Sequence, residues 1–189
     1  MSRTKLSTVA VVDRAAVMLD ERGPAGLNLA SLAEALDVRV PSLYKHIDGM
    51  PGLRRGIMIQ AKTSLAHALG GAAIGRSRDD AIMRMSIAYR HWALEHPGQY
   101  PMTMHAPIPG DDEDLTVSSS ITEIVYNVLT GYDLRDDDAV DATRFLRSAL
   151  HGFVALETSG GFALPVDLER SYLRLVSSVA TALAGWSRQ

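Results

Sequence analysis

The sequence has no cysteine and few aromatic residues, and these absences narrow what the protein can be. Without cysteine, neither a disulfide framework nor a thiolate metal site is possible. Aromatic residues make up only 6% of the chain, and no period-two alternation of apolar side chains persists, so strand signals are nearly absent. No apolar run approaches the ~18 residues of a membrane span. Because Asp13 and Arg14 interrupt the N-terminal apolar stretch that a secretory signal would need, we expect a cytoplasmic protein with no membrane partner.

Charge is distributed unevenly along the 189 residues, although the net charge is only −3. Residues 1–62 carry nine Lys and Arg against six Asp and Glu, whereas the remainder carries ten against sixteen. Such an imbalance is typical of an anion-binding head joined to an acidic body. The length suits one good-sized domain or a small domain fused to a larger one.

Apolar residues recur at helical spacing, which predicts an all-α fold of about nine helices. Three short helices come first. Ser7 begins a helix that Gly23 and Pro24 end, Asn28 caps the second, and Pro41 lies in the first turn of the third, which ends near residue 47. A bundle of longer helices follows, with expected bounds of 51–69, 77–96, 111–129, 136–158 and 165–186.

The three short helices have the dimensions of a helix-turn-helix head. Leu43 and Ile47, one helical turn apart, are expected to face the core, and a tight turn near Asp37 directs the third helix. A helix so placed can enter a major groove ~12 Å wide. The residues expected to face the core from the first helix are Val9, Val12, Ala16 and Leu19. Those expected to face outward from the third, with chemistry suited to phosphates or guanine, are Arg39, Ser42, Lys45 and His46.

Catalysis and metal binding are other interpretations of these side chains. Ser42 and His46 form an i,i+4 pair, but no acid that would orient the histidine lies nearby in the sequence. His91 and His96 are five residues apart, nearly opposite around a helix, and no H-x-x-x-H pair of ligands occurs. We therefore predict no enzyme, no metal site and no cofactor. An all-α enzyme or ligand carrier with a vestigial head is the alternative.

The segment ASLAEALDVRVPSLYKHIDGMPGL, residues 30–53, resembles the signature of the tetracycline-repressor (TetR) family. Downstream, HPGQYPMTM (96–104) and LHGFVALETSGGF (150–162) resemble ligand-binding segments of that family, in the subgroup with a Trp-His-Gly-type element. The resemblance departs from the usual pattern in three places. Asp37 stands where glycine is usual, a basic residue that is common near Ala30 is missing, and Met50 replaces a common lysine beside an unusual Pro51. The matching residues of the Leu-Ala pair, the turn and the P-x-L-Y-x-H core are Leu32, Ala33, Val38, Pro41, Leu43, Tyr44 and His46.

This resemblance implies a homodimeric transcriptional repressor that leaves its operator DNA when a small molecule binds the C-terminal bundle. An activator of the same fold is an alternative. The resemblance places a helix-turn-helix DNA-binding domain in residues 1–49 and a ligand-binding and dimerisation domain in residues 50–189, with helix four as the linker. Tyr44 and His46 are expected to hold phosphates. The full set of expected DNA-binding residues is Asn28, Ser31, Arg39, Val40, Ser42, Tyr44, Lys45 and His46.

Large or adaptable apolar residues on the later helices predict a ligand cavity, because a cavity between bundle helices needs such walls and a few polar groups. Methionine repacks easily and suits variable ligands. Glu157 is a further polar candidate. The expected ligand-binding residues are Met83, Ile87, His91, Trp92, Tyr100, Met102, Met104, Tyr126, His151 and Phe153.

Apolar stripes on the last two helices predict the surface on which two copies associate. By resemblance, two helices from each copy would form a four-helix bundle. Two-fold symmetry then lets the two heads reach major grooves about 34–36 Å apart or a multiple of that distance. The predicted dimer residues are Leu146, Leu150 and Val154 on one helix, and Leu168, Tyr172, Leu175 and Val179 on the other.

Overall fold

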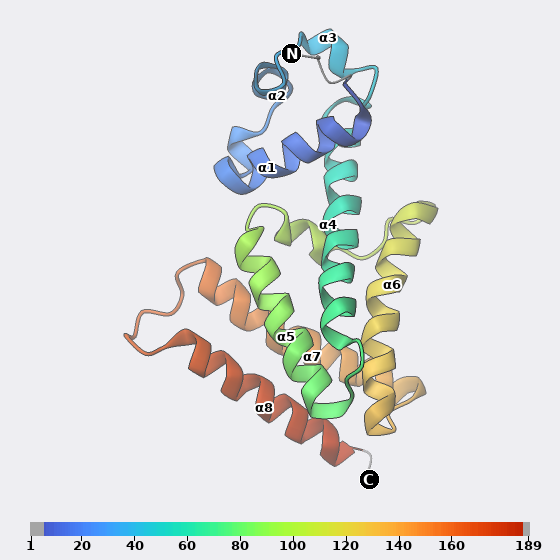
Figure 1. Cartoon of the computed structure of the whole chain (residues 1–189), viewed down its shortest axis with the longest axis vertical. Coiled ribbons are helices and arrows are strands. Elements are labelled where there is room, and N and C mark those ends of the chain that lie inside the picture. Colours follow the sequence, from blue (N-terminus) through green and yellow to red (C-terminus); the bar gives the residue numbers. More distant parts are fainter. Residues whose placement is uncertain (1–5, 187–189) are drawn as a thin grey trace. The chain divides into compact units, whose positions relative to one another are not determined.

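The computed structural model describes residues 6–186, and the regular elements in that range are all helices, which confirms the all-α prediction (Figure 1). The described residues form eight α-helices and two short 3₁₀-helices, where the sequence predicted about nine helices. None of these helices is both long enough and apolar enough to span a bilayer. Their bounds are α1 Thr8–Gly26, α2 Leu29–Ala35, α3 Val40–Leu43, α4 Gly49–Ala73, α5 Arg78–Glu95, η1 Tyr100–Met104, α6 Asp112–Leu129, η2 Thr130–Tyr132, α7 Asp136–Thr158 and α8 Leu168–Trp186.

Four helices begin or end elsewhere than the sequence predicts by more than one residue. α1 continues past Gly23 and Pro24 to Gly26, with a non-helical backbone conformation at Gly23 (φ +66°). α3 stops at Leu43, and a turn carries the chain on to Ile47. α4 continues through Gly70 and Gly71 to Ala73, although glycine is unfavourable inside a helix. Gly70 lies beside Ile124 of α6, whose side chain a Cβ atom at this position would meet at 3.4 Å. α8 begins at Leu168, later than expected.

The chain divides into two compact units, and each contains two stretches of sequence. Unit 1 consists of Met1–Thr63 and Glu95–Ala106, and unit 2 of Ser64–Leu94 and Pro107–Gln189. The sequence placed the boundary between residues 49 and 50, with helix four as a linker. In the structure, the first part of α4 and a later segment around η1 pack with the N-terminal helices instead.

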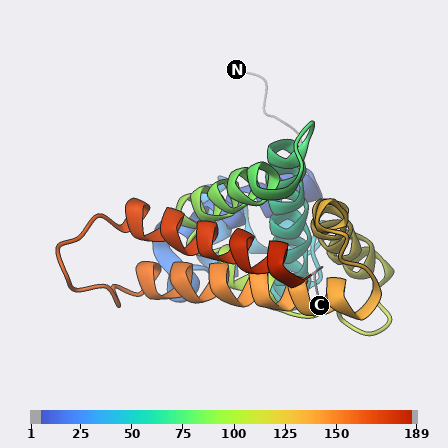
Figure 2. The ribbon, with the colours of Figure 1, turned by 90° about the horizontal axis from the view of Figure 1, so that it is seen from below.

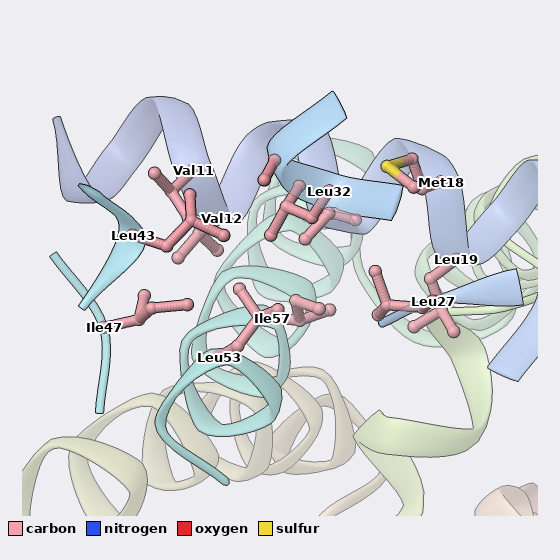
Figure 3. Packing of buried hydrophobic residues seen from close by; sticks show 13 residues of the cluster. Val11, Val12, Met18, Leu19, Leu27, Leu32, Leu43, Ile47, Leu53 and Ile57 are labelled. Atoms are coloured by element: carbon pink, nitrogen blue, oxygen red, sulfur yellow. The ribbon is translucent and has the colours of Figure 1, made fainter. Parts of the chain in front are cut away.

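Apolar residues of α1, α2, α3 and the start of α4 meet in the core of unit 1. Leu43 and Ile47 point into this core, as the sequence predicts (Figure 3). Val9, predicted to face inward, is 68% exposed. It lies in the first turn of α1, at the edge of the buried arc at 100° per residue. The buried residues of α1 are Val11, Val12, Ala15, Ala16, Met18 and Leu19.

Asp20 of α1 explains why residues 95–106 belong to unit 1. Its carboxylate accepts hydrogen bonds from the Gly98 N–H (2.9 Å), the Gln99 N–H (3.0 Å) and the Gln99 side-chain amide (2.6 Å). The Nδ1 atom of His96 lies 3.1 Å from the same carboxylate. A Cβ atom on Gly98 would lie 2.2 Å from the carbonyl oxygen of Leu19, so glycine permits the close approach of the two backbones.

In unit 2, α7 and α8 lie side by side and run in opposite directions (Figure 2). The stripes predicted as the dimer surface face the interior of this unit. Leu168 and Leu175 keep partial exposure, but the other five residues are at most 4% exposed, because neighbouring helices of the same chain cover them. The stripe is therefore protomer core, and a second copy that docks on these helices would meet the residues beside it. The five buried residues are Leu146, Leu150, Val154, Tyr172 and Val179.

Candidate nucleic-acid interface

A capping box fixes the start of α2. The Asn28 side-chain oxygen accepts hydrogen bonds from the N–H groups of Ala30 (3.0 Å) and Ser31 (2.9 Å). In return, the Ser31 hydroxyl accepts from the Asn28 N–H at 3.2 Å. The Ser31 Oγ atom lies within donating distance of two carbonyl oxygens, those of Gly26 (3.2 Å) and Asn28 (3.0 Å). Both predicted DNA-binding residues therefore stabilise the helix start, which leaves the exposed Asn28 amide group as the outward donor.

The turn between α2 and α3 is a Schellman motif centred on Asp37. This residue has φ +52°, in the left-handed region where glycine is the favoured residue. The Val38 N–H donates to the Ala33 carbonyl (2.9 Å) and the Asp37 N–H to the Glu34 carbonyl (3.1 Å), which are the two hydrogen bonds of the motif. Val38 packs against the head core. This turn sets the direction in which α3 leaves α2.

α3 is a single helical turn whose inner side is anchored and whose outer side is polar. Pro41 lies in its first turn, as predicted, and Leu43 is fully buried. Val40, predicted to face DNA, is half-buried and packs against the head core. Tyr44 is 59% exposed, although it is aromatic. Of the other predicted DNA-binding residues in this segment, Arg39 and Lys45 are exposed, whereas Ser42 and His46 are half-buried.

The end of this segment is fastened to α1. The hydroxyl of Thr8 donates to the backbone carbonyl of His46 at 3.1 Å, and the His46 N–H donates to the Leu43 carbonyl at 2.8 Å. The backbone around Tyr44 and Lys45 is therefore held at both ends, by the Asp37 turn and by α1. Fixed backbone with exposed polar side chains is the arrangement that positions groups on a nucleic acid.

The residues predicted to line a ligand cavity are divided between the two units. Tyr100, Met102 and Met104 belong to unit 1, where Met102 packs against the head core. The rest belong to unit 2. Among these, Trp92 is buried, and its indole N–H donates to the Ser64 hydroxyl at 2.9 Å, whereas His91 is exposed. The half-buried members are Met83, Ile87, Tyr126, His151 and Phe153.

Comparison with known proteins identifies the lineage of this fold. Residues 82–179 match the family model described as tetracyclin repressor-like, C-terminal domain. The uncharacterized HTH-type transcriptional regulator Rv0681 of Mycobacterium tuberculosis is 38% identical over 157 residues, which cover 82% of this chain and 72% of that protein. The uncharacterized HTH-type transcriptional regulator YobS of Bacillus subtilis is 34% identical over 188 residues, covering 97% of this chain and 94% of that one. The chain belongs to the TetR family.

Solved structures of TetR-family proteins share the fold at lower identity. The regulator SCO7222 from Streptomyces coelicolor has a TM-score of 0.74 at 18% identity, covering 95% of this chain and 98% of that one. A TetR variant from Acinetobacter baumannii, solved in complex with minocycline, has a TM-score of 0.73 at 17% identity, covering 97% and 99%. With relatives that are HTH-type transcriptional regulators over most of its length, this TetR-family protein is a transcriptional regulator.

In this TetR-family regulator, the sequence does not indicate that Arg90 forms an ion pair with Glu157. Its Nε and Nη2 atoms donate to the two carboxylate oxygens of Glu157, at 2.7 and 2.6 Å, in a two-pronged pair. The hydrogen bond to Glu157 raises the pKa of Arg90 above its ordinary value, against the opposing effect of burial. The partners are 67 residues apart in the sequence, so no local pattern indicates the pair.

Proposed function

We propose that this TetR-family regulator is a cytoplasmic, non-catalytic repressor that holds its operator through α3 and leaves it when a small molecule binds in unit 2. The observation that carries the proposal is the anchored turn of α3, which buries Leu43 and Ile47 and leaves Arg39, Tyr44 and Lys45 exposed. The minocycline complex of the related TetR structure supports a ligand-responsive role.

Each exposed group of the head suits a particular contact with duplex DNA. Arg39 and Lys45 are assigned to guanine acceptors or phosphates, and Tyr44 to a phosphate through its hydroxyl. His46 is assigned to a phosphate near the Thr8 contact that fixes its backbone. The free amide of Asn28 is assigned to the DNA backbone at the start of α2. Ser42 adds a hydroxyl donor, and Val40 and Ser31 contribute chiefly by holding the helices in place.

The repressor is proposed to act as a homodimer, with the exposed side of α7 in the interface. Phe145 and Leu156, both large and apolar, are 36% and 49% exposed on this helix. Between them, Ser148 and Gly152 are small and exposed, so a second helix can approach closely. A two-fold axis through this face would place two heads on grooves one turn of DNA apart or a multiple of it.

Release by ligand follows from a shift of population between states with different head separations. The candidate ligand-binding residues within unit 2 are Met83, Ile87, His91, Trp92, Tyr126, His151 and Phe153. The sequence also predicts ligand-binding roles for Tyr100, Met102 and Met104 of unit 1. We propose that their segment transmits the effect of ligand binding to α1 through its hydrogen bonds with Asp20.

A gel-shift experiment tests the proposal. The wild-type protein is expected to retard a DNA fragment from upstream of its own gene and not an unrelated fragment of equal length. Tyr44→Phe combined with His46→Ala is expected to abolish the shift while leaving the melting temperature near that of the wild type, because Tyr44 is largely exposed. Loss of binding by the double variant supports α3 as the DNA contact. Failure of the wild-type protein to bind at low salt would reject the repressor, and would favour a ligand carrier with a vestigial head.

A further inference from the structure

The ion pair between Arg90 and Glu157 is unusually enclosed for a pair of charged side chains. The side chains are only 12% and 11% exposed, and both carboxylate oxygens are engaged by the guanidinium. Moving two charges out of water costs free energy that their attraction repays only partly. By contrast, the surface pair of Arg144 with Asp141 in the same unit leaves both side chains more than half exposed. A contribution to the stability of the fold therefore does not explain why this ion pair is enclosed.

One aromatic ring lies against the guanidinium side of the pair, and two further rings continue from it. The Arg90 guanidinium lies 5.4 Å from the ring centre of Tyr172. The ring of Phe153 lies 5.1 Å from that of Tyr172 and 4.8 Å from that of Phe162. These rings come from α7, α8 and the loop between them, and together they form a chain of aromatic faces leading away from the charge. Such walls suit an aromatic or apolar ligand body attached to a charged group.

Ser86 adds a buried polar group without a partner. It is fully buried, and its hydroxyl has no hydrogen-bond partner. The Tyr172 hydroxyl donates to the Ser86 backbone carbonyl at 2.7 Å, which does not satisfy the side chain. Ser86 precedes Arg90 by four residues on α5, so both lie on one face of that helix. A buried hydroxyl left unpaired is costly and requires an explanation, and a ligand oxygen would supply the missing partner.

The two members of the ion pair differ in how easily each can be replaced. Glu157 lies in the last turn of α7, where the helix dipole disfavours a negative charge. The helix ends directly after it in a Schellman motif, with Gly160 at φ +73° and the Gly161 N–H donating to the Leu156 carbonyl at 2.7 Å. Glu157 therefore lies directly before the exposed residues 158–160 that end the helix. Arg90 lies inside α5, with its guanidinium against the Tyr172 ring.

We propose that Arg90 anchors a site for an organic carboxylate with an aromatic body, in which the ligand carboxylate replaces that of Glu157. The body lies against the rings of Phe153 and Tyr172 and takes the place of Phe162, which is carried by an exposed loop. The Ser86 hydroxyl donates to the ligand. In the absence of ligand, the Glu157 carboxylate then occupies the position that the ligand carboxylate takes on Arg90. This inference rests on the proposed ligand response, and it names the chemical class of that ligand.

Two probes and two pairs of variants test the assignment in the full-length protein. Benzoate represents the carboxylate class and benzamidine is a cation of similar size; the binding of each is measured by calorimetric titration. Arg90→Gln removes the anchor, with Arg84→Gln as the matched control, because Arg84 lies on the same helix but is 59% exposed. Glu157→Gln removes the stand-in charge, with Asp141→Asn, on α7 and 65% exposed, as its control.

Opposite changes are expected from the two variants of the pair. Glu157→Gln should bind benzoate more tightly than the wild type, and Arg90→Gln more weakly, each by roughly ten- to a hundredfold, the range of a charge-assisted hydrogen bond. The control variants should match the wild type. If Glu157→Gln binds no benzoate, or if benzamidine binds and Glu157→Gln abolishes its binding, the carboxylate assignment is overturned.

The DNA affinity of the same proteins without probe separates this inference from the proposed function. A wild-type protein that binds its operator but ignores benzoate in every variant would overturn only the assignment of the ligand class. A protein that binds benzoate through Arg90 but no DNA would instead reject the repressor.

Discussion

Gly98→Ala tests the close contact between α1 and the segment that follows α5. A Cβ atom at this position would lie 2.2 Å from the Leu19 carbonyl oxygen, 2.4 Å from its carbonyl carbon and 2.8 Å from the Asp20 nitrogen. All three are backbone atoms, which no side-chain rotation can move aside. Ordinary contact begins near 3.4 Å, so the two backbones must separate by about 1.2 Å at the closest pair.

That separation exceeds what the hydrogen bonds at the same place can tolerate. The Gly98 and Gln99 N–H groups lie 2.9 and 3.0 Å from the Asp20 carboxylate, and a contact beyond about 3.5 Å is no longer a hydrogen bond. Hydrogen bonds to a charged group contribute about 1.5–3 kcal/mol each, and the partial exposure of Asp20 favours the lower figure. Loss of two gives a decrease of about 3 kcal/mol in the free energy of unfolding.

Thermal melting followed by circular dichroism measures the effect. For a chain of this size, about 3 kcal/mol corresponds to a decrease in Tm of roughly 6–12 °C. Gly71→Ala is the matched control, because a Cβ atom on Gly71 meets nothing within 4 Å and the residue lies inside α4. It should raise the stability by about 0.5–1 kcal/mol, the helix propensity gain. A Gly98→Ala protein that melts within a degree or two of the wild type would refute this account of the contact.

Three further substitutions test other parts of the structure. Asp37→Gly should stabilise the protein by about 0.5 kcal/mol in urea titration, because glycine adopts φ +52° without strain. The same change should tighten DNA binding, because it removes a carboxylate near the phosphates. Asp37→Asn removes the charge without adding glycine and so separates the two effects, and unchanged DNA affinity in both variants would contradict the electrostatic part. Gly160→Ala should cost about 1 kcal/mol, because φ +73° is unfavourable for alanine, and no loss in the same titration would contradict the Schellman ending of α7. Gly152→Arg should convert the proposed dimer to a monomer in sedimentation velocity, whereas Gly71→Arg should not; a dimeric Gly152→Arg protein would exclude this face as the interface.

Local chemistry explains why much of the head could be predicted from the sequence. Ser7 and Asn28 cap the helices that follow them, and Asp37 adopts the left-handed conformation that the tight turn requires. Each of these features depends on hydrogen bonds between residues a few positions apart. Pro41 and the inward placement of Leu43 likewise follow from neighbouring residues, so the sequence is sufficient to predict them.

Features that depend on distant residues could not be predicted in this way. An apolar stripe such as Leu146 to Val154 looks the same whether another helix of the same chain or a second copy covers it, and the structure shows the former. The pairs Arg90 with Glu157 and Asp20 with Gly98 are separated by 67 and 78 residues. Periodicity describes which face of a helix is buried, but it does not identify the partner.

The salt dependence of DNA binding tests the central claim, that the exposed side of α3 holds the operator. Fluorescence anisotropy with a labelled operator fragment gives the affinity at several salt concentrations for the wild type, for Arg39→Ala with Lys45→Ala, and for Arg76→Ala with Arg84→Ala. The last pair is the control, because both arginines lie at Asp80 in unit 2. The account predicts that the α3 variant loses at least about tenfold in affinity and that its log–log salt slope falls by about 1–2, as expected for one or two lost phosphate contacts, while the control is unchanged. Equal affinity and slope in all three proteins would contradict it.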